Sequence, residues 1–301
     1  MPASLTDILG WVVVAGFLAS ALLDVAGERE RTTRAARAVA AATWVVFALF
    51  WLLLVPHYAF AQKSYVEGLG SAAAVPLSLY VGYLVWAARP TLLFLSRAVA
   101  VMGLLYLPFQ TIDPLRTATI ETVARQAAWA MESLGYQPSI VEGYGGYQNE
   151  FAFPGQGGPE DFAVYVILAC SGIGSIATVS GLVLAVREPL RRRLTALAVV
   201  VPVIYVLNVA RVVFIVLAAN FEWFAFAEPT LGGVFGTGDP EAISYYVSDR
   251  LIAQTLSVFV LLGMVWGLLR YLPALSVYVE EVAYLLTGRE IDVQEQFAAG
   301  E

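Results

Sequence analysis

One cysteine and two arginines lie in apolar stretches where ionisable side chains are out of place. Cys170 is the only cysteine among the 301 residues and sits in "ILACSGIGSI". Arg211 lies inside "VIYVLNVARVVFIVLAA", and Arg250 lies inside "AISYYVSDRLIAQTLSVFVLL". The thiolate is the nucleophilic form of cysteine, and a neighbouring arginine lowers the pKa of a thiol. The three residues could therefore form a cysteine nucleophile with two cations that stabilise the thiolate and an oxyanion.

The arginines carry most of this argument, because a cysteine in a membrane helix is usually a small packing residue. An arginine at the centre of such a helix costs about 2.5–3.5 kcal/mol on insertion scales. Such residues usually face the bundle interior and pair with another group, so anion transport and structural pairing stay open as alternatives. Asp249 is a possible structural partner of Arg250, although adjacent helix positions point about 100° apart.

Neighbouring residues could support the chemistry. Ser171 and Gly172 follow the cysteine in "SGIGS", which keeps the backbone narrow, so that a substrate carbonyl can approach the sulfur. Asn208 lies one helical turn before Arg211 on the same face, where it could orient the guanidinium or donate to a carbonyl. Arginine itself cannot act as a general base. His57 is the only histidine, and we favour a non-catalytic role for it.

Composition indicates an integral membrane protein. Hydrophobic residues make up 59% of the chain and charged residues 14%, whereas a soluble domain carries about a quarter charged residues. One cysteine cannot form an internal disulfide. The net charge is −7 and Lys63 is the only lysine, which is a poor profile for a nucleic-acid partner. We expect an all-α polytopic helix bundle with no metal site and no cofactor.

Apolar runs predict seven membrane spans, since a spanning helix needs about 20 mostly apolar residues. The spans are residues 5–23, 37–55, 71–88, 91–109, 162–186, 194–219 and 243–269. Arginines gather in alternate connections, and the positive-inside rule places those connections in the cytoplasm. The N-terminus is then outside and the C-terminus inside. The tail, 271–301, is apolar on one face and predicts an amphipathic helix at the inner surface, with an eighth span as an alternative.

The outer connections include a long loop, residues 110–161, in which the stretch from Pro114 to Gly135 predicts a surface helix. Each candidate residue lies about seven or eight residues from the outer end of its span, roughly 10–12 Å deep at 1.5 Å per residue. Cys170, Arg211 and Arg250 would then converge in one pocket open to the exterior. We expect a single membrane domain over residues 1–301.

The stretches "ACSGI" at 169–173, "NVAR" at 208–211 and "SDR" at 248–250 resemble the exosortase/archaeosortase family in their order and spacing. The resemblance covers the whole chain in span number and order, and it is strongest to the archaeosortases of haloarchaea. It implies that Cys170, Arg211 and Arg250 are catalytic. Bacterial exosortases usually have histidine where this chain has Arg250, so the general base stays open.

This resemblance implies a cysteine transpeptidase of the cell membrane that acts on the exterior side. Its substrates would be secreted or surface proteins, such as an S-layer glycoprotein, with a C-terminal Pro-Gly-Phe motif, a membrane helix and a basic tail. Cleavage would pass through a Cys170 thioester, which an amine of a membrane lipid would then resolve. An intramembrane cysteine protease without transfer, an anion-binding transporter and a structural membrane protein remain alternatives.

Overall fold

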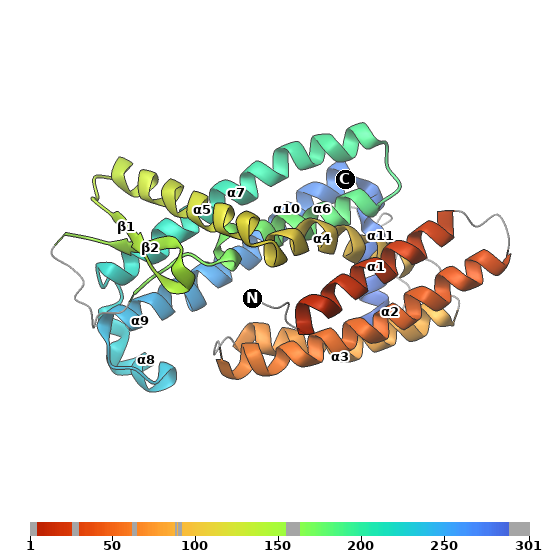
Figure 1. Ribbon diagram of the computed structural model, residues 1–301, viewed down its shortest axis with the longest axis horizontal. Helices are drawn as coiled ribbons and strands as arrows, with labels where there is room; N and C mark the ends of the chain where they lie inside the picture. The colour runs from red at the N-terminus through yellow and green to blue at the C-terminus, as the bar shows by residue number, and fades with distance from the viewer. Residues whose placement is uncertain are drawn as a thin grey trace. The chain divides into compact units, whose positions relative to one another are not determined.

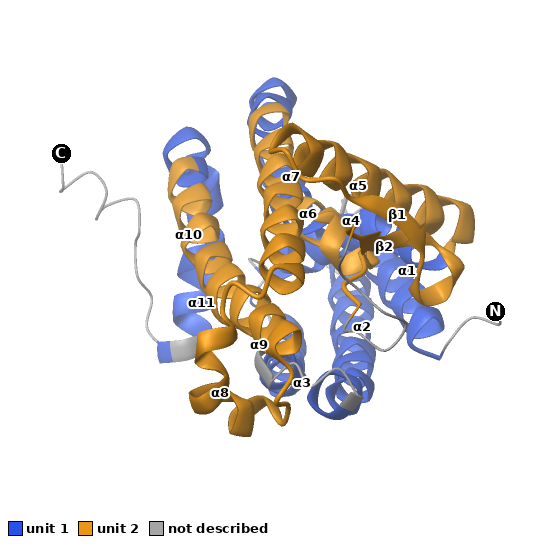
Figure 2. Cartoon of the chain, turned by 90° about the vertical axis from the view of Figure 1, so that its left-hand side faces the viewer, with its two compact units in different colours: residues 1–111, 177–197, 268–301 blue, residues 112–176, 198–267 orange. Residues whose placement is uncertain are grey.

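The computed structural model of the protein describes residues 5–25, 30–61, 65–87, 89, 92–154 and 163–288. The chain divides into two compact units (Figure 2). Unit 1 comprises residues 1–111, 177–197 and 268–301, and unit 2 comprises residues 112–176 and 198–267. The expected single membrane domain over residues 1–301 stays a prediction.

Six helical segments among the described residues are long and apolar enough to cross a membrane, in agreement with the expected all-α polytopic bundle. These segments are Leu5–Asp24, Thr33–Phe60, Glu67–Trp86, Leu93–Thr111, Leu190–Asn220 and Pro240–Tyr271. In this order they coincide or overlap with the helices of Figure 1 named α1 (Leu5–Val25), α2 (Glu30–Pro56), α3 (Tyr65–Trp86), α4 (Leu93–Thr111), α7 (Leu190–Asn220) and α10 (Gln254–Tyr271). The side of the membrane that each end faces stays a prediction.

Aromatic and small side chains form the core of unit 1. Helix α1 packs against α2 and α4, and α2 packs against α3. Phe17 of α1 is fully buried, and its ring centroid lies 5.1 Å from that of Trp44. Trp44 Nε1 donates a hydrogen bond to Ser96 Oγ at 2.9 Å. This bond gives the indole N–H a partner inside an otherwise apolar core.

Residues 162–186 do not form the continuous span that their apolar character predicted. Helix α6 covers only Ile173–Ala185, which is 13 residues and short of the roughly 20 that a span needs. A 3₁₀ turn, η4 (Leu168–Ser171), precedes it, and the backbone at Tyr165 pairs with Glu150 as in a β-sheet. An apolar run fits a buried strand and a short helix as well as one long helix.

The long loop of the sequence analysis contains a helix and a small hairpin in unit 2. The helix expected between Pro114 and Gly135 is α5 (Asp113–Ser133). The part of this loop after the helix includes the antiparallel strands β1 (Ser139–Glu142) and β2 (Gln148–Ala152). Both strands contact α5. Helix α5 buries one face there, formed by Ile120, Val123, Ala124, Ala127, Ala128 and Met131.

A π-helix interrupts the last long apolar segment. Helices α8 (Glu228–Phe235) and α9 (Pro240–Tyr246) lead to η6 (Val247–Ala253), which continues into α10. A π-helix bonds residue i to i+5 and is frequently found at functional sites. Helix α11 (Ser276–Thr287) has 12 residues and is not one of the six candidate spans. The rest of the tail, residues 289–301, lies outside the described residues.

Candidate active site

Cys170 lies in the 3₁₀ turn η4 rather than inside a long helix. Ser171 shapes this turn: its buried hydroxyl donates to the Leu168 carbonyl at 2.7 Å and accepts from the Ile173 N–H at 3.3 Å. The Ser171 side chain is therefore committed to the backbone of the turn. Ser171 therefore supports Cys170 by shaping the turn that carries it.

Gly172 ends the turn in the left-handed conformation, with φ at +75°. A side chain is strained at such a φ, whereas glycine is not. A Cβ atom at this position would also lie 3.1 Å from Asn208 Cβ and 3.2 Å from Asn208 Cγ. The sequence suggested that this glycine leaves room for a substrate carbonyl. That expectation stays a prediction, and the structure adds a second reason for glycine here, which is that it lets α7 approach the turn closely.

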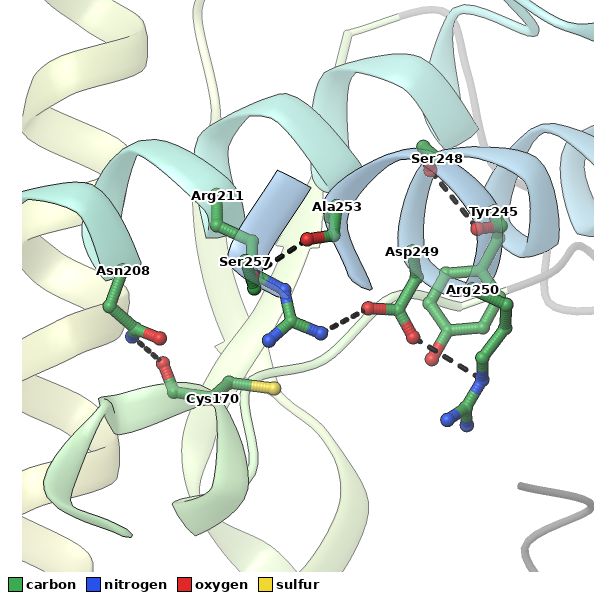
Figure 3. Close-up of polar contacts among 9 residues, drawn as sticks. All are labelled: Cys170, Asn208, Arg211, Tyr245, Ser248, Asp249, Arg250, Ala253 and Ser257. Atoms are coloured by element: carbon green, nitrogen blue, oxygen red, sulfur yellow. Dashed lines mark hydrogen bonds and ion pairs between the residues drawn. The ribbon is translucent and has the colours of Figure 1, made fainter. Parts of the chain in front are cut away.

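Asn208 joins the turn of Cys170 to α7. Its Nδ2 donates a hydrogen bond to the backbone carbonyl of Cys170 (Figure 3). Of the two roles that the spacing suggested for Asn208, the structure shows donation to a carbonyl, and that carbonyl belongs to Cys170 itself. Helix α7 thus holds the backbone of the candidate nucleophile Cys170.

Arg211 lies one turn further along α7 and reaches the same place. In Figure 3 the Cys170 sulfur points toward the Arg211 guanidinium, whose Nη2 atom donates to Asp249 Oδ1 at 2.6 Å. The Arg211 Nε atom is buried without a hydrogen-bond partner among the described residues. The guanidinium therefore lies between a thiol and a carboxylate, with one arm held by the carboxylate.

Asp249 pairs with both arginines, which makes it the centre of the charged cluster. Arg250 Nε lies 3.4 Å from Asp249 Oδ2, and the Asp249 side chain is only 10% exposed. The sequence alone indicates Asp249 only as a possible structural partner of its neighbour Arg250. Two cations and one carboxylate leave a net charge of +1, which a Cys170 thiolate or an oxyanion would balance.

Tyr245 is a member of the cluster that the sequence analysis missed. Its ring lies beside Asp249 and Arg250 in Figure 3, and their charges and the Cys170 thiol all act on its hydroxyl. Tyr245 precedes Asp249 by four residues, which is one helical turn. That spacing is the signal that could have identified it, because residues four apart are neighbours on a helix surface.

The electrostatics of Cys170 oppose one another. Burial raises the pKa of the Cys170 thiol, and Asp249 raises it further, whereas the Ile167 backbone N–H and the cations Arg211 and Arg250 lower it. The result is a raised pKa, so the Cys170 thiol stays protonated to a higher pH than an ordinary cysteine does. The residue is only partly buried, which leaves part of its surface open to a substrate.

The site in unit 2 brings together Cys170, Asn208, Arg211 and Arg250. His57 belongs to the π-helix η1 (His57–Ala61) in unit 1, and its non-catalytic role stays a prediction. Among the described residues, no group of three or more His, Cys, Asp or Glu side chains could hold a metal ion.

Comparisons with known proteins show the family to which the chain belongs. The family described as Transmembrane exosortase matches residues 5–238. Archaeosortase A of Haloferax volcanii is 43% identical over 306 residues, which cover 98% of this chain and 99% of the relative. Archaeosortase A of Natronomonas pharaonis is 41% identical over 297 residues, which cover 96% of this chain and 90% of the relative. No solved structure matches the chain. The chain belongs to the transmembrane exosortase family.

Proposed function

We propose that this membrane protein is a cysteine transpeptidase with Cys170 as its nucleophile. The observation that carries the proposal is the direction of the Cys170 side chain, whose sulfur points toward the Arg211 guanidinium (Figure 3). Asn208 holds the same residue by its backbone carbonyl. A thiol that is only a packing residue needs neither a fixed backbone nor a cation in front of it.

The reaction would proceed in two acyl transfers. The Cys170 sulfur attacks a peptide carbonyl, the S–C bond forms, the C–N bond breaks, and the thiol proton ends on the departing amine. The amine of the acceptor then attacks the thioester carbonyl and forms an amide bond. The C–S bond breaks, and the proton released by the amine restores the Cys170 thiol. No oxidant or metal enters the balance of either transfer.

The two arginines would have separate parts in these steps. Arg211 faces the sulfur and would stabilise the thiolate, because a cation close to sulfur favours its charged form. Arg250 would donate to the oxyanion of the tetrahedral intermediate. Asp249 would hold both guanidinium groups in place, since it pairs with each of them.

The substrate and acceptor follow from family membership rather than from the geometry. We infer a secreted or surface protein with a Pro-Gly-Phe motif, a membrane helix and a basic tail, an S-layer glycoprotein being one candidate. The acceptor would be the amine of a membrane lipid. The relatives named Archaeosortase A support this choice. The site would face the exterior of the cell membrane, where such substrates are found.

The mass of a processed substrate's C-terminus tests the proposal. Cells that lack their own archaeosortase would carry the wild-type chain, Cys170→Ala, Cys170→Ser or the control Arg125→Ala, whose side chain is 60% exposed. We expect a lipid-bearing product with the wild type and the control, and the uncleaved substrate with both Cys170 variants. Serine fails because its hydroxyl has a far higher pKa than a thiol.

Other results would identify the alternatives. A product with a free C-terminal carboxylate would indicate a protease without transfer. Normal maturation with Cys170→Ala would contradict covalent catalysis and leave the anion-binding transporter as the better explanation of the two arginines.

A further inference from the structure

Residues 163–167 form an extended segment, with one β-bridge at Tyr165, that runs directly into the turn of Cys170. Its side chains alternate, with Val164 and Val166 buried and Ala163 and Tyr165 exposed. The backbone forms an antiparallel bridge between Tyr165 and Glu150 of β2, and the Val166 N–H donates to the Asn149 carbonyl at 2.8 Å. Glu150 also pairs with β1, so this segment lies along the opposite edge of β2.

The other edge of this segment is open at Tyr165. Successive residues of a strand direct their N–H and C=O groups to opposite edges. Because Val166 N–H bonds to β2, the backbone groups of Tyr165 point away from β2. Within the described part of the chain, no hydrogen bond reaches the N–H or the C=O of Tyr165.

This open edge is held firmly from behind. Asn149 is fully buried, and its Nδ2 donates to the Val166 carbonyl at 2.7 Å and to the Tyr144 carbonyl at 3.3 Å. The Tyr165 ring stacks on the Tyr144 ring, with 5.2 Å between centroids and 18° between planes. The stacking on Tyr144 holds the Tyr165 ring, and the Asn149 hydrogen bond holds the backbone of the next residue, Val166.

The edge also lies close to the nucleophile. The Cys170 thiol and the Glu150 carboxylate both act electrostatically on the Tyr165 hydroxyl. The extended segment ends at Ile167, whose carbonyl accepts a hydrogen bond from the Cys170 N–H at 2.8 Å. A chain paired with Tyr165 would therefore pass the sulfur within a few residues.

We propose that the substrate polypeptide binds as an added β-strand along the edge at Tyr165 and is thereby guided to Cys170. This inference rests on the proposed transpeptidase function and adds how the substrate is held. Strand addition obtains affinity from main-chain hydrogen bonds, so it accepts many sequences on the side of the cleavage site that lacks a motif. One substrate residue would exchange two hydrogen bonds with Tyr165, as in an antiparallel pair.

An N-methyl scan of the substrate tests the pairing without changing the enzyme. The probes are synthetic peptides with a Pro-Gly-Phe motif, a membrane helix and a basic tail, each with one backbone N-methyl group near the scissile bond. The wild-type chain is reconstituted with them in lipid vesicles. We expect cleavage to slow at least tenfold for methyl groups at alternate residues, because only every second N–H of a strand faces its partner.

A matched pair of enzyme variants tests the same contact from the other side. Tyr165→Pro removes the edge N–H but leaves the Val166 bond to Asn149, whereas Tyr165→Ala removes only the ring. We expect kcat/KM to fall at least tenfold with proline relative to alanine. The most harmful N-methyl group should then cost little in the proline variant, because the same contact is already lost.

The outcomes separate the two proposals. If the unmethylated peptide is not cleaved by the wild type, the proposed function fails. If it is cleaved but all N-methyl peptides behave alike, only the strand pairing is overturned, and a segment of this chain or a second copy occupies the edge. If Tyr165→Pro fails to fold, the scan on the wild-type chain decides alone.

Discussion

Asp249 connects the two arginines of the candidate site. It holds Arg211 at 2.6 Å and Arg250 at 3.4 Å, and its negative charge opposes ionisation of Cys170. The same carboxylate therefore positions the two cations and disfavours the thiolate form of Cys170. These two effects have opposite signs, so they can be separated by experiment.

Asp249→Asn should make the thiol more reactive and the enzyme less active. Asp249 raises the pKa of the Cys170 thiol, so removing its negative charge lowers that pKa. The pH profile of alkylation by iodoacetamide should therefore shift to lower pH. Substrate maturation should fall, because neither guanidinium is held by a charge. Cys170 is the only cysteine, so alkylation reports on it alone. Unchanged alkylation and full maturation would remove Asp249 from the site.

Arg211 is expected to need both its charge and its planar shape. One arm of the guanidinium binds Asp249 while the group faces the sulfur, and lysine cannot hold two partners in that fixed plane. Arg211→Ala should lower the maturation rate about tenfold or more, because the thiolate loses a cation that lowers the pKa of the thiol and one pKa unit is a tenfold change in thiolate. Arg211→Lys should lie between alanine and wild type. Rates are compared at matched protein levels in the membrane, and a lysine variant at the wild-type rate would contradict the two-partner role.

At the scale of elements, the close approach of η4 and α7 depends on Gly172. Alanine there would adopt a φ that costs roughly 1–2 kcal/mol and would crowd Asn208, 3.1 Å away. Gly172→Ala should therefore lower thermal stability and slow maturation. Gly267→Ala is the matched control, since its helical site has open space around it. Equal behaviour of the two variants would show that the close approach has no consequence.

Local sequence predicted the helices better than it predicted the way the site is built. The apolar spacing of α5 and the out-of-place Cys170, Arg211 and Arg250 were sufficient to identify a helix and a candidate site. The extended segment at 163–167 was not predicted, because its exposed positions are also mostly apolar. The alternation of apolar and polar residues that indicates a strand is therefore missing. The π-helix around Asp249 has no local sequence signature, and it decides which side chains meet there.

At the scale of the whole molecule, the arginine distribution predicts the topology. A cysteine at Gln148 should be outside and one at Leu190 inside. Each would be introduced into Cys170→Ala and labelled in intact cells with a membrane-impermeant maleimide. Only the Gln148→Cys variant should react, and both should react after lysis. Labelling of Leu190→Cys in intact cells would reverse the orientation and turn the site to the cytoplasm.

The position of Asn208 and Arg211 on one helix has a consequence for the response to lipids. Helices adjust to bilayer thickness by changing their tilt. Asn208 donates a hydrogen bond to the Cys170 carbonyl, and Arg211 faces the Cys170 sulfur from the next turn of α7. A tilt of α7 would therefore carry the Cys170 thiol and the Arg211 guanidinium together. The distance between the thiol and the guanidinium would then change little as the helix tilts. Thicker or thinner bilayers would alter how the substrate arrives while leaving the thiol and its cation in register.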